Sequence, residues 1–242
     1  MTEQLFTERF PFISSVPGER RQQILHYFRT APDWLLDYFK IDYIDSGVVF
    51  IREGQPVDHV YLFASGIIKA TDLRVLGTEF DFVRFDKAYA MGGMEVIMGL
   101  PEYKTTLKTV TKCIAIKIPR KQYEQWLMSD IVALQNESKL MGEYLLEQGR
   151  LARAYLLLNG AERLSMLLIQ KYEKYERNGV LQVKANRQDL ANETGLALKT
   201  ITRSVKKLTE EGLITKAGRY LLINHEQYLQ LKAIVDSVID TR

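Results

Sequence analysis

The sequence predicts an α+β protein with a β-rich N-terminal domain, a long helix and a C-terminal winged helix-turn-helix. Three patterns support this fold class. Short apolar runs separated by glycines lie between residues 42 and 118, a 3,4 repeat begins at Ile131, and two short amphipathic helices with a hairpin pattern after them follow Arg187. At 242 residues, of which 46% are hydrophobic, the chain is long enough to form two cores.

The N-terminal domain is predicted to begin with helices and to continue as short strands. Residues 1 to about 40 show the apolar spacing of helices around Ile24 and Trp34. The strand-type runs after Asp42 are VVFI, HVYLF, GIIKA, FDFVRF and CIAIKI. Many short strands with glycines between them predict a β-sandwich or a β-barrel. The last run alternates in a way that would bury Cys113 as a small apolar side chain.

A long helix with a coiled-coil seam follows the strands. The 3,4 spacing runs over Ile131, Leu134, Ser138, Met141, Leu145, Gln148, Ala152 and Tyr155. The repeat predicts a homodimer interface made by its apolar members, which are Ile131, Leu134, Met141, Leu145, Ala152 and Tyr155. Because Ser138 and Gln148 are polar, the alternative is a helix that packs only on its own chain.

The stretch from Arg187 to Gly212 has the pattern of a helix-turn-helix. Apolar residues recur with helical spacing at Leu190, Leu196, Ile201, Val205 and Leu208, and Thr194-Gly195 divides them into two helices. Ala191 lets the second helix approach closely, and Gly195 supplies the positive φ of a tight turn. Ile201 is expected to fill the gap between the two helices.

The second helix of this pair presents basic and hydroxyl side chains, with no acidic residue before Glu210. Its polar residues are Lys199, Thr200, Thr202, Arg203, Ser204, Lys206 and Lys207. Cations attract phosphates, and Arg and short hydroxyls can reach base edges in the major groove, so the helix is predicted to read double-stranded DNA. The alternative is an ordinary solvated helix beside a core. Residues 160–242 carry 14 Lys and Arg against 10 Asp and Glu, while the rest carries 19 against 20, so the basic excess is C-terminal.

The remaining C-terminal pattern completes a winged helix and sets the domain boundaries. A helix after Asn159-Gly160, a turn at residues 177–179 and a strand at 180–183 precede the DNA motif. After it, two β-type runs flank Ala217-Gly218 as a hairpin, and a final helix follows His225. We therefore expect a β-domain with N-terminal helices at 1–128, a dimerisation helix at 129–158 and a DNA-binding domain at 159–242. A dimeric helix-turn-helix protein binds paired half-sites, so the operator should be palindromic.

Composition excludes several classes of function. No apolar run is long enough to span a bilayer and no signal-type segment opens the chain, so we expect a cytoplasmic protein with no membrane partner. One cysteine cannot form an internal disulfide or hold an iron-sulfur cluster, and three scattered histidines do not form a local metal motif. We accordingly expect no cofactor, no metal and no enzymatic activity.

Two segments together resemble the cyclic-AMP receptor protein family, the CRP/FNR regulators. They are VVFIREGQPVDHVYLFASGIIKA, which resembles the family's second-to-fourth strand region, and DLANETGLALKTITRSVKKLTEEGLI, which resembles its DNA motif. The resemblance covers the chain from about Asp42. It implies a homodimeric bacterial transcription factor whose β jelly-roll domain, of the cyclic-nucleotide-binding type, binds a small effector and repositions the recognition helices.

The family's nucleotide-binding cassette is altered here. In cyclic-nucleotide binders of this family a Gly-Glu pair holds the ribose hydroxyl, and a later Arg-Ser or Arg-Thr binds the cyclic phosphate. The matching segment is GGMEVIMGLPEYKTTL, in which Gly93 keeps the glycine, Met94 replaces the glutamate, Lys104 replaces the arginine and Thr105 keeps the hydroxyl. Methionine accepts no hydrogen bond from ribose, and an ammonium lacks the planar donor geometry of guanidinium. An effector other than cyclic AMP is therefore expected.

The resemblance places this effector against the cassette and the long helix. The expected contacts are Gly92, Gly93, Met94, Lys104, Thr105 and Thr106, with Tyr144 and Gln148 closing over them. Lys104 implies an anionic ligand. Glu95 lies one position after the ribose site, and strand alternation would turn it away. For haem, the one histidine of the β-domain is His59, and a surface or strand-end position explains this residue better than a role as a haem ligand.

The resemblance also assigns roles on DNA. The family reads bases with an Arg-Glu pair and an Arg four residues after that Glu, and the matching residues are Leu198, Lys199 and Arg203. Arg203 can donate two hydrogen bonds to guanine, while Leu198 offers only an apolar contact. Lys206, Lys207, Thr200 and the wing residue Arg219 are expected to contact phosphates.

Two other readings remain at this point. The protein could be a DNA-binding dimer without small-molecule control, whose β-domain serves only dimerisation or contact with RNA polymerase. A jelly-roll domain could also host a cupin-type metal enzyme, but such enzymes need clustered histidines and carboxylates. The sequence does not identify the effector or the operator, nor whether binding activates or represses transcription.

Overall fold

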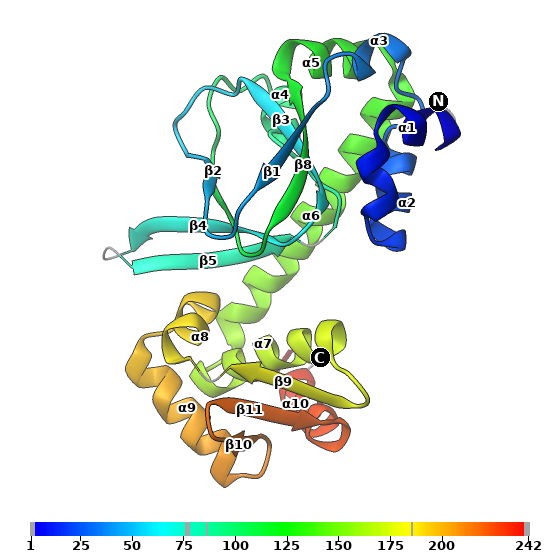
Figure 1. The fold of residues 1–242 in the computed structure, drawn as a ribbon. Helices are drawn as coiled ribbons and strands as arrows, with labels where there is room; N and C mark the ends of the chain where they lie inside the picture. The colour runs from blue at the N-terminus through cyan, green and yellow to red at the C-terminus, as the bar shows by residue number, and fades with distance from the viewer. Residues whose placement is uncertain (1–2, 76–77, 86, 185, 240–242) are drawn as a thin grey trace. The chain divides into compact units, whose positions relative to one another are not determined.

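The computed structural model describes residues 3–75, 78–85, 87–184 and 186–239 (Figure 1). The chain divides into two compact units. The N-terminal unit consists of Met1–Asp72 and Val83–Leu145, and the C-terminal unit consists of Leu73–Phe82 and Leu146–Arg242. The long helix α6, Ile131–Leu157, is continuous and contributes residues to both units. None of the helices in the described ranges has both the length and the apolar character that crossing a bilayer requires.

The N-terminal unit begins with four short helical segments that share an aromatic core. They are α1 (Glu3–Arg9), the 3-10 helix η1 (Pro11–Ser15), α2 (Gly18–Tyr27) and α3 (Asp33–Leu36). The ring of Phe28 lies at the centre of this core, with ring centroids 4.8 Å from Phe39, 6.0 Å from Phe6 and 5.7 Å from Trp126 of α5 (Arg120–Ser129). These tilted and offset pairs bury large apolar areas and attach the first 40 residues to the unit.

Two four-stranded antiparallel sheets follow these helices, in the orders β1-β8-β3-β6 and β2-β7-β4-β5 (Figure 1), and residues 73–82 of β4 and β5 are the part of them that belongs to the C-terminal unit. The strands are β1 (Lys40–Ile44), β2 (Val49–Ile51), β3 (His59–Ser65), β4 (Ile68–Val75), β5 (Thr78–Phe85), β6 (Ala90–Met91), β7 (Thr106–Thr109) and β8 (Cys113–Pro119). The predicted β-sandwich is confirmed, and so is the burial of Cys113. Strands β1, β6 and β7 were not predicted, because their segments of the sequence contain no clear apolar run.

The C-terminal unit has the order of elements of a winged helix. It contains α7 (Gly160–Tyr175), β9 (Val180–Lys184), α8 (Arg187–Thr194), α9 (Leu198–Glu210), β10 (Thr215–Ala217), β11 (Tyr220–Asn224) and α10 (His225–Ile239). The strands form an antiparallel sheet in the order β10-β11-β9. The predicted winged helix-turn-helix is therefore confirmed.

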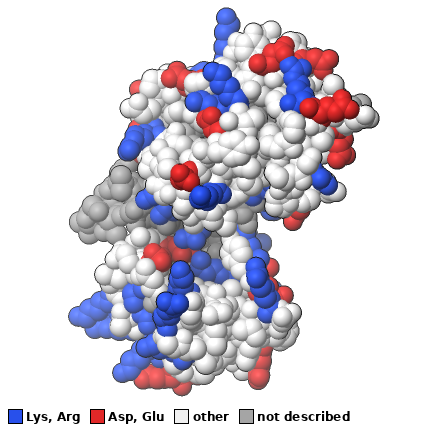
Figure 2. Space-filling view, viewed as in Figure 1, with Lys and Arg blue, Asp and Glu red and all other residues white. Residues whose placement is uncertain are grey.

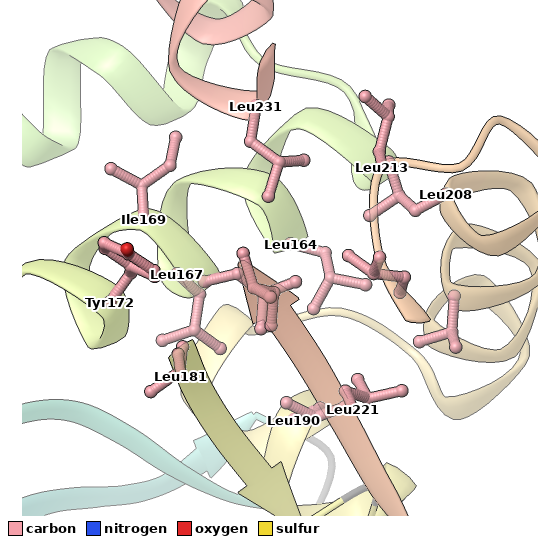
Figure 3. Close-up of a cluster of buried hydrophobic side chains, with 14 of the residues drawn as sticks. Leu164, Leu167, Ile169, Tyr172, Leu181, Leu190, Leu208, Leu213, Leu221 and Leu231 are labelled. Atoms are coloured by element: carbon pink, nitrogen blue, oxygen red, sulfur yellow. The ribbon is translucent and has the colours of Figure 1, made fainter. Parts of the chain in front are cut away.

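One hydrophobic core holds this unit together (Figure 3). Leu164 of α7, Leu221 of β11 and Leu231 of α10 are completely buried in it, and so is Ile201 of α9. Since each of these elements contributes a side chain that no solvent reaches, the position of α9 is fixed from several sides.

Two tight turns complete the motif. Gly195, in the left-handed conformation with φ 66°, ends α8, as the sequence predicts. The wing differs from the prediction by one residue. Ala217 pairs with Tyr220, so the hairpin turn is Gly218-Arg219 rather than Ala217-Gly218. The reason is conformational, because Gly218 has φ 57° and belongs at the first position of a two-residue turn.

Candidate nucleic-acid interface and effector site

Helix α9 separates an apolar face from a basic one. Ile201, Val205 and Leu208 are buried in the core. Lys199, Arg203 and Lys206 recur at intervals of four and three residues on the exposed side. Thr202 and Leu198 also lie exposed, and the helix begins at Leu198 without a side-chain cap.

The hydroxyl residues of α9 are not equivalent. Ser204 is buried, so the expectation that its hydroxyl reaches bases is wrong. Thr200 is half-buried against the start of α7, where a Cβ added to Gly160 would lie 2.6 Å from the Thr200 Cγ2 atom. The Thr202 hydroxyl donates to the carbonyl of Leu198 at 2.9 Å. Of the three, Thr202 is the one exposed residue.

The last turn of α9 carries ion pairs within the helix. Lys206 Nζ lies 3.7 Å from Glu210 and Lys207 Nζ lies 3.8 Å from Glu211. All four side chains are exposed, and such pairs contribute about 0.3–0.5 kcal/mol. The pairs are therefore weak enough for a phosphate to compete for either lysine.

A basic hollow of about 490 Å³ opens beside this motif, between the end of β9, the start of α8 and the tip of the wing. It is lined by Lys184, Asn186, Arg187, Lys216, Gly218 and Arg219. Burial lowers the pKa of Arg187. Figure 2 shows Lys and Arg side chains gathered over the part of this unit where Figure 1 draws α9 and the wing. Arg219, one of the predicted DNA contacts, lines the hollow. Three further cationic side chains that were not predicted as DNA contacts line it as well.

The added cations, Lys184, Arg187 and Lys216, come from three separate elements. The antiparallel pairing of β11 with both β9 and β10 brings Lys184 and Lys216 into one sheet. Asn186 caps α8 by accepting from the Gln188 N–H at 3.0 Å, which fixes the direction in which α8 starts. The available sequence signal was that Arg187 opens the first helix of the motif.

The cassette of the N-terminal unit is a helix rather than a strand. Gly92, with φ 97°, precedes α4 (Gly93–Ile97). If the cassette glycine were Gly92, the residue that precedes α4, the ribose carboxylate would fall on Gly93 instead of Met94. Neither alignment supplies a carboxylate.

Glu95 is occupied within the chain. Its side chain is buried, and its Oε1 atom accepts the backbone N–H of Lys104 at 3.1 Å. Residues 93–97 are helical, so the prediction that strand alternation turns Glu95 away is wrong. Glu95 instead closes the loop between α4 and β7. The Lys104 side chain itself is exposed.

The other expected effector contacts are only partly brought together. Thr105 and Thr106 are half-buried, and the Thr106 Oγ1 atom accepts from the Glu53 N–H at 3.1 Å. Tyr144 of α6 lies beside Phe85 with ring centroids 5.7 Å apart, and Phe85 contacts Tyr89, which precedes the cassette. Gln148 belongs to the C-terminal unit.

The seam face of α6 is largely uncovered in the single chain. Ile131 is 66% exposed and Leu145 is 53% exposed. Leu134 and Met141 are half-buried, and Ala152 is exposed. Tyr155 is half-buried, with the Arg163 guanidinium 5.6 Å from its ring.

The structure offers little for a metal. In the part of the chain that it describes, no group of three or more His, Cys, Asp or Glu side chains is placed to hold an ion. His59 begins β3, and its pKa is lowered by burial and by the nearby Lys117.

A β jelly roll, a long helix with an apolar face and a winged helix with a basic surface define a DNA-binding regulator. Comparison with known protein families supports this class of protein. Residues 42–130 match the cyclic nucleotide-binding domain and residues 149–231 match the Crp-like helix-turn-helix domain. The chain belongs to the CRP/FNR family of transcriptional regulators, whose members bind DNA and are not enzymes.

Similar proteins include regulators from several organisms. The anaerobic regulatory protein of Pasteurella multocida is 25% identical over 197 residues, which cover 75% of this chain and 67% of that protein. The c-di-GMP-responsive global regulator CLP of Xanthomonas campestris has a similar fold, with a TM-score of 0.69 at 19% identity over 78% of this chain and 95% of that one. The structure of a putative CRP/FNR-family regulator of Eubacterium rectale has a TM-score of 0.70 at 14% identity. The match covers 93% of this chain and 99% of that one.

The basic hollow generates a prediction about salt. Replacing Lys216 by Ala should weaken binding to all duplexes by a similar factor and lower the slope of log K against log salt by about 0.9, because one phosphate contact is lost. Fluorescence anisotropy with two unrelated duplexes measures both quantities. Lys232 of α10, which bonds to Tyr228, is the control, and its Ala variant should keep the wild-type slope. An unchanged slope for Lys216→Ala would remove the hollow from the interface.

Proposed function

We propose that this chain is a homodimeric, sequence-specific regulator of transcription that responds to a small-molecule effector other than cyclic AMP. Residues 1–128 would sense the effector, 129–158 would dimerise and 159–242 would bind DNA. The observation that carries the proposal is the basic face of α9, which stands exposed because the opposite face is buried in the core. RNA polymerase is the expected partner of the DNA-bound form.

On DNA, we assign direct base reading to the exposed start and middle of α9. Arg203 can donate two hydrogen bonds to the O6 and N7 atoms of guanine. Lys199 and Thr202 share its exposed side, and Leu198 is placed to contact a thymine methyl. Lys206, Lys207, Thr200 and Arg219 would contact phosphates, together with the cations of the hollow.

The dimer proposal is supported by the uncovered apolar side chains of α6. Large apolar side chains that remain exposed along one face of a long helix indicate a partner. Leu156, which is 83% exposed, lies four residues after Ala152 and extends this face. A second copy of α6 would cover it and set the spacing between two recognition helices on a palindromic operator.

The effector proposal is supported by what the cassette lacks. Gly93 and Met94 offer no carboxylate to a ribose, and Glu95 is bonded to the Lys104 N–H. The exposed ammonium of Lys104 favours an anion. Each charged hydrogen bond lost from a nucleotide site costs about 1.5–3 kcal/mol, which is sufficient to abolish tight binding of cyclic AMP.

Replacing Arg203 by Ala should cost about 1–3 kcal/mol of DNA binding and relax the preference at one base pair in each half-site. Selection of bound sequences from a random pool measures this directly. Lys206→Ala is the matched control on the same helix, and it should weaken all sequences alike. If the Arg203 variant selects the wild-type motif, α9 does not enter the groove in the proposed orientation.

Replacing both Leu134 and Leu145 by Asp should give monomers with weak DNA affinity, because like charges would be buried face to face at a cost of several kcal/mol. Light scattering measures the mass. Leu146, an exposed leucine beside the seam, is the control, and Leu146→Asp should leave the dimer intact. A double variant that stays dimeric would show that the seam is misassigned.

Calorimetry should detect at most weak binding of cyclic AMP. A thermal-shift screen of anionic metabolites should identify a ligand that raises the melting temperature of the folded chain. Lys104→Ala should reduce that shift, whereas Lys112→Ala, which removes another exposed cation of the same unit, should not. A sub-micromolar dissociation constant for cyclic AMP would contradict the assignment of the cassette.

A further inference from the structure

A carboxyl group that forms no ion pair with any described residue is buried where three helices of the N-terminal unit meet. Glu137 of α6 is 3% exposed. The Tyr27 hydroxyl of α2 donates to its Oε2 atom at 2.6 Å, and the hydroxyls of Tyr27 and Tyr123 of α5 are 2.5 Å apart. These short hydrogen bonds connect α2, α5 and α6 through three polar groups inside an apolar core.

The carboxyl also lies directly against the effector cassette. A Cβ added to Gly93, the first residue of α4, would be 2.5 Å from Glu137 Oε1 and 3.0 Å from the Tyr123 hydroxyl. Because Gly93 has no side chain, the backbone of α4 and the carboxyl can occupy adjacent positions. A movement of either α4 or α6 must therefore disturb the other.

The charges around this group do not neutralise it. The described groups that bond to it are the hydroxyls of Tyr27 and Tyr123. Glu95 of α4 is turned to the Lys104 N–H, and Arg29, which follows α2, donates to Asn136 at 3.3 Å and contacts His26. Burial raises the pKa of Glu137 from 4.5 to about 7, although both hydroxyls act in the opposite direction.

We propose that Glu137 is a proton-dependent latch that holds α6 against α2, α5 and the cassette helix when it is protonated and loosens this contact when it ionises. A neutral carboxyl is compatible with an apolar core, whereas an unpaired carboxylate there favours water. The segment that would be released contains Ile131, Leu134 and Met141 of the proposed dimer face. This contact involves neither an effector nor DNA. An experiment can therefore contradict the latch without contradicting the proposed function, and the reverse also holds.

The direction of the pH effect follows from linkage. The pKa is higher in the folded state, so the stabilising effect is complete below about pH 4.5 and is lost as the pH rises through about 7. Between pH 6 and pH 8 the local closing equilibrium should fall about tenfold. The loss should be confined to the elements that contact the latch.

Hydrogen exchange of the full-length chain at pH 6 and pH 8, corrected for the intrinsic pH dependence, tests this. Peptides that cover residues 90–97 and 131–144 should lose about tenfold in protection at pH 8, and peptides from α7 to α10 serve as the internal reference. In Glu137→Gln, which keeps the shape and cannot ionise, the protection of these peptides should be the same at both pH values. Equal changes in wild type and variant would overturn the proposal.

A second variant distinguishes the latch from simple packing. The Tyr27 hydroxyl favours the ionised carboxyl, so Tyr27→Phe should move the midpoint of the Glu137 titration to higher pH. Carboxyl-carbon NMR of the wild type and of this variant measures the midpoint directly, whether or not Glu137→Gln folds. A wild-type carboxyl that does not titrate between pH 5.5 and 8.5, or a midpoint that Tyr27→Phe leaves unchanged, would also overturn the proposal.

Discussion

The constraint on which the DNA-binding unit depends is the complete burial of one face of α9. Ile201, Val205 and Leu208 pack into a core shared with α7, α8, the small sheet and α10, and this burial leaves Lys199, Arg203 and Lys206 no direction except outward. The sheet then places the wing and the end of β9 beside the start of α8, where four cations line one hollow. A hydrophobic contact therefore determines the geometry of a charged surface, and the charges themselves contribute little to the fold.

Helix α6 has to satisfy two opposite requirements. One side carries Glu137 and the buried Ala133 into the N-terminal unit, and the other carries exposed apolar residues such as Leu145. An amphipathic helix normally has one apolar face and one polar face. Here the inward face includes a buried carboxyl group, and the outward face carries exposed leucines such as Leu145.

The sequence predicted the C-terminal unit better than the cassette. The periodicity of Leu190, Ile201, Val205 and Leu208, with Gly195 between the helices, is local and survives in the structure. The hollow was missed because Lys184 and Lys216 meet only through sheet pairing, which no local pattern reports. Glu95 was misread because a short apolar segment can be helix or strand. The roles of Tyr27 and Glu137 depend on a contact between residues 110 positions apart.

The close approach at Gly160 has a consequence for how this regulator can change during evolution. Even the smallest side chain there would overlap the methyl group of Thr200. The start of α7 is thus in close contact with the Thr200 side chain of α9. New operator preferences can be acquired by exchanging the outward residues of α9, one at a time, on a scaffold that stays fixed. A side chain at residue 160 would instead require Thr200 of α9 to move.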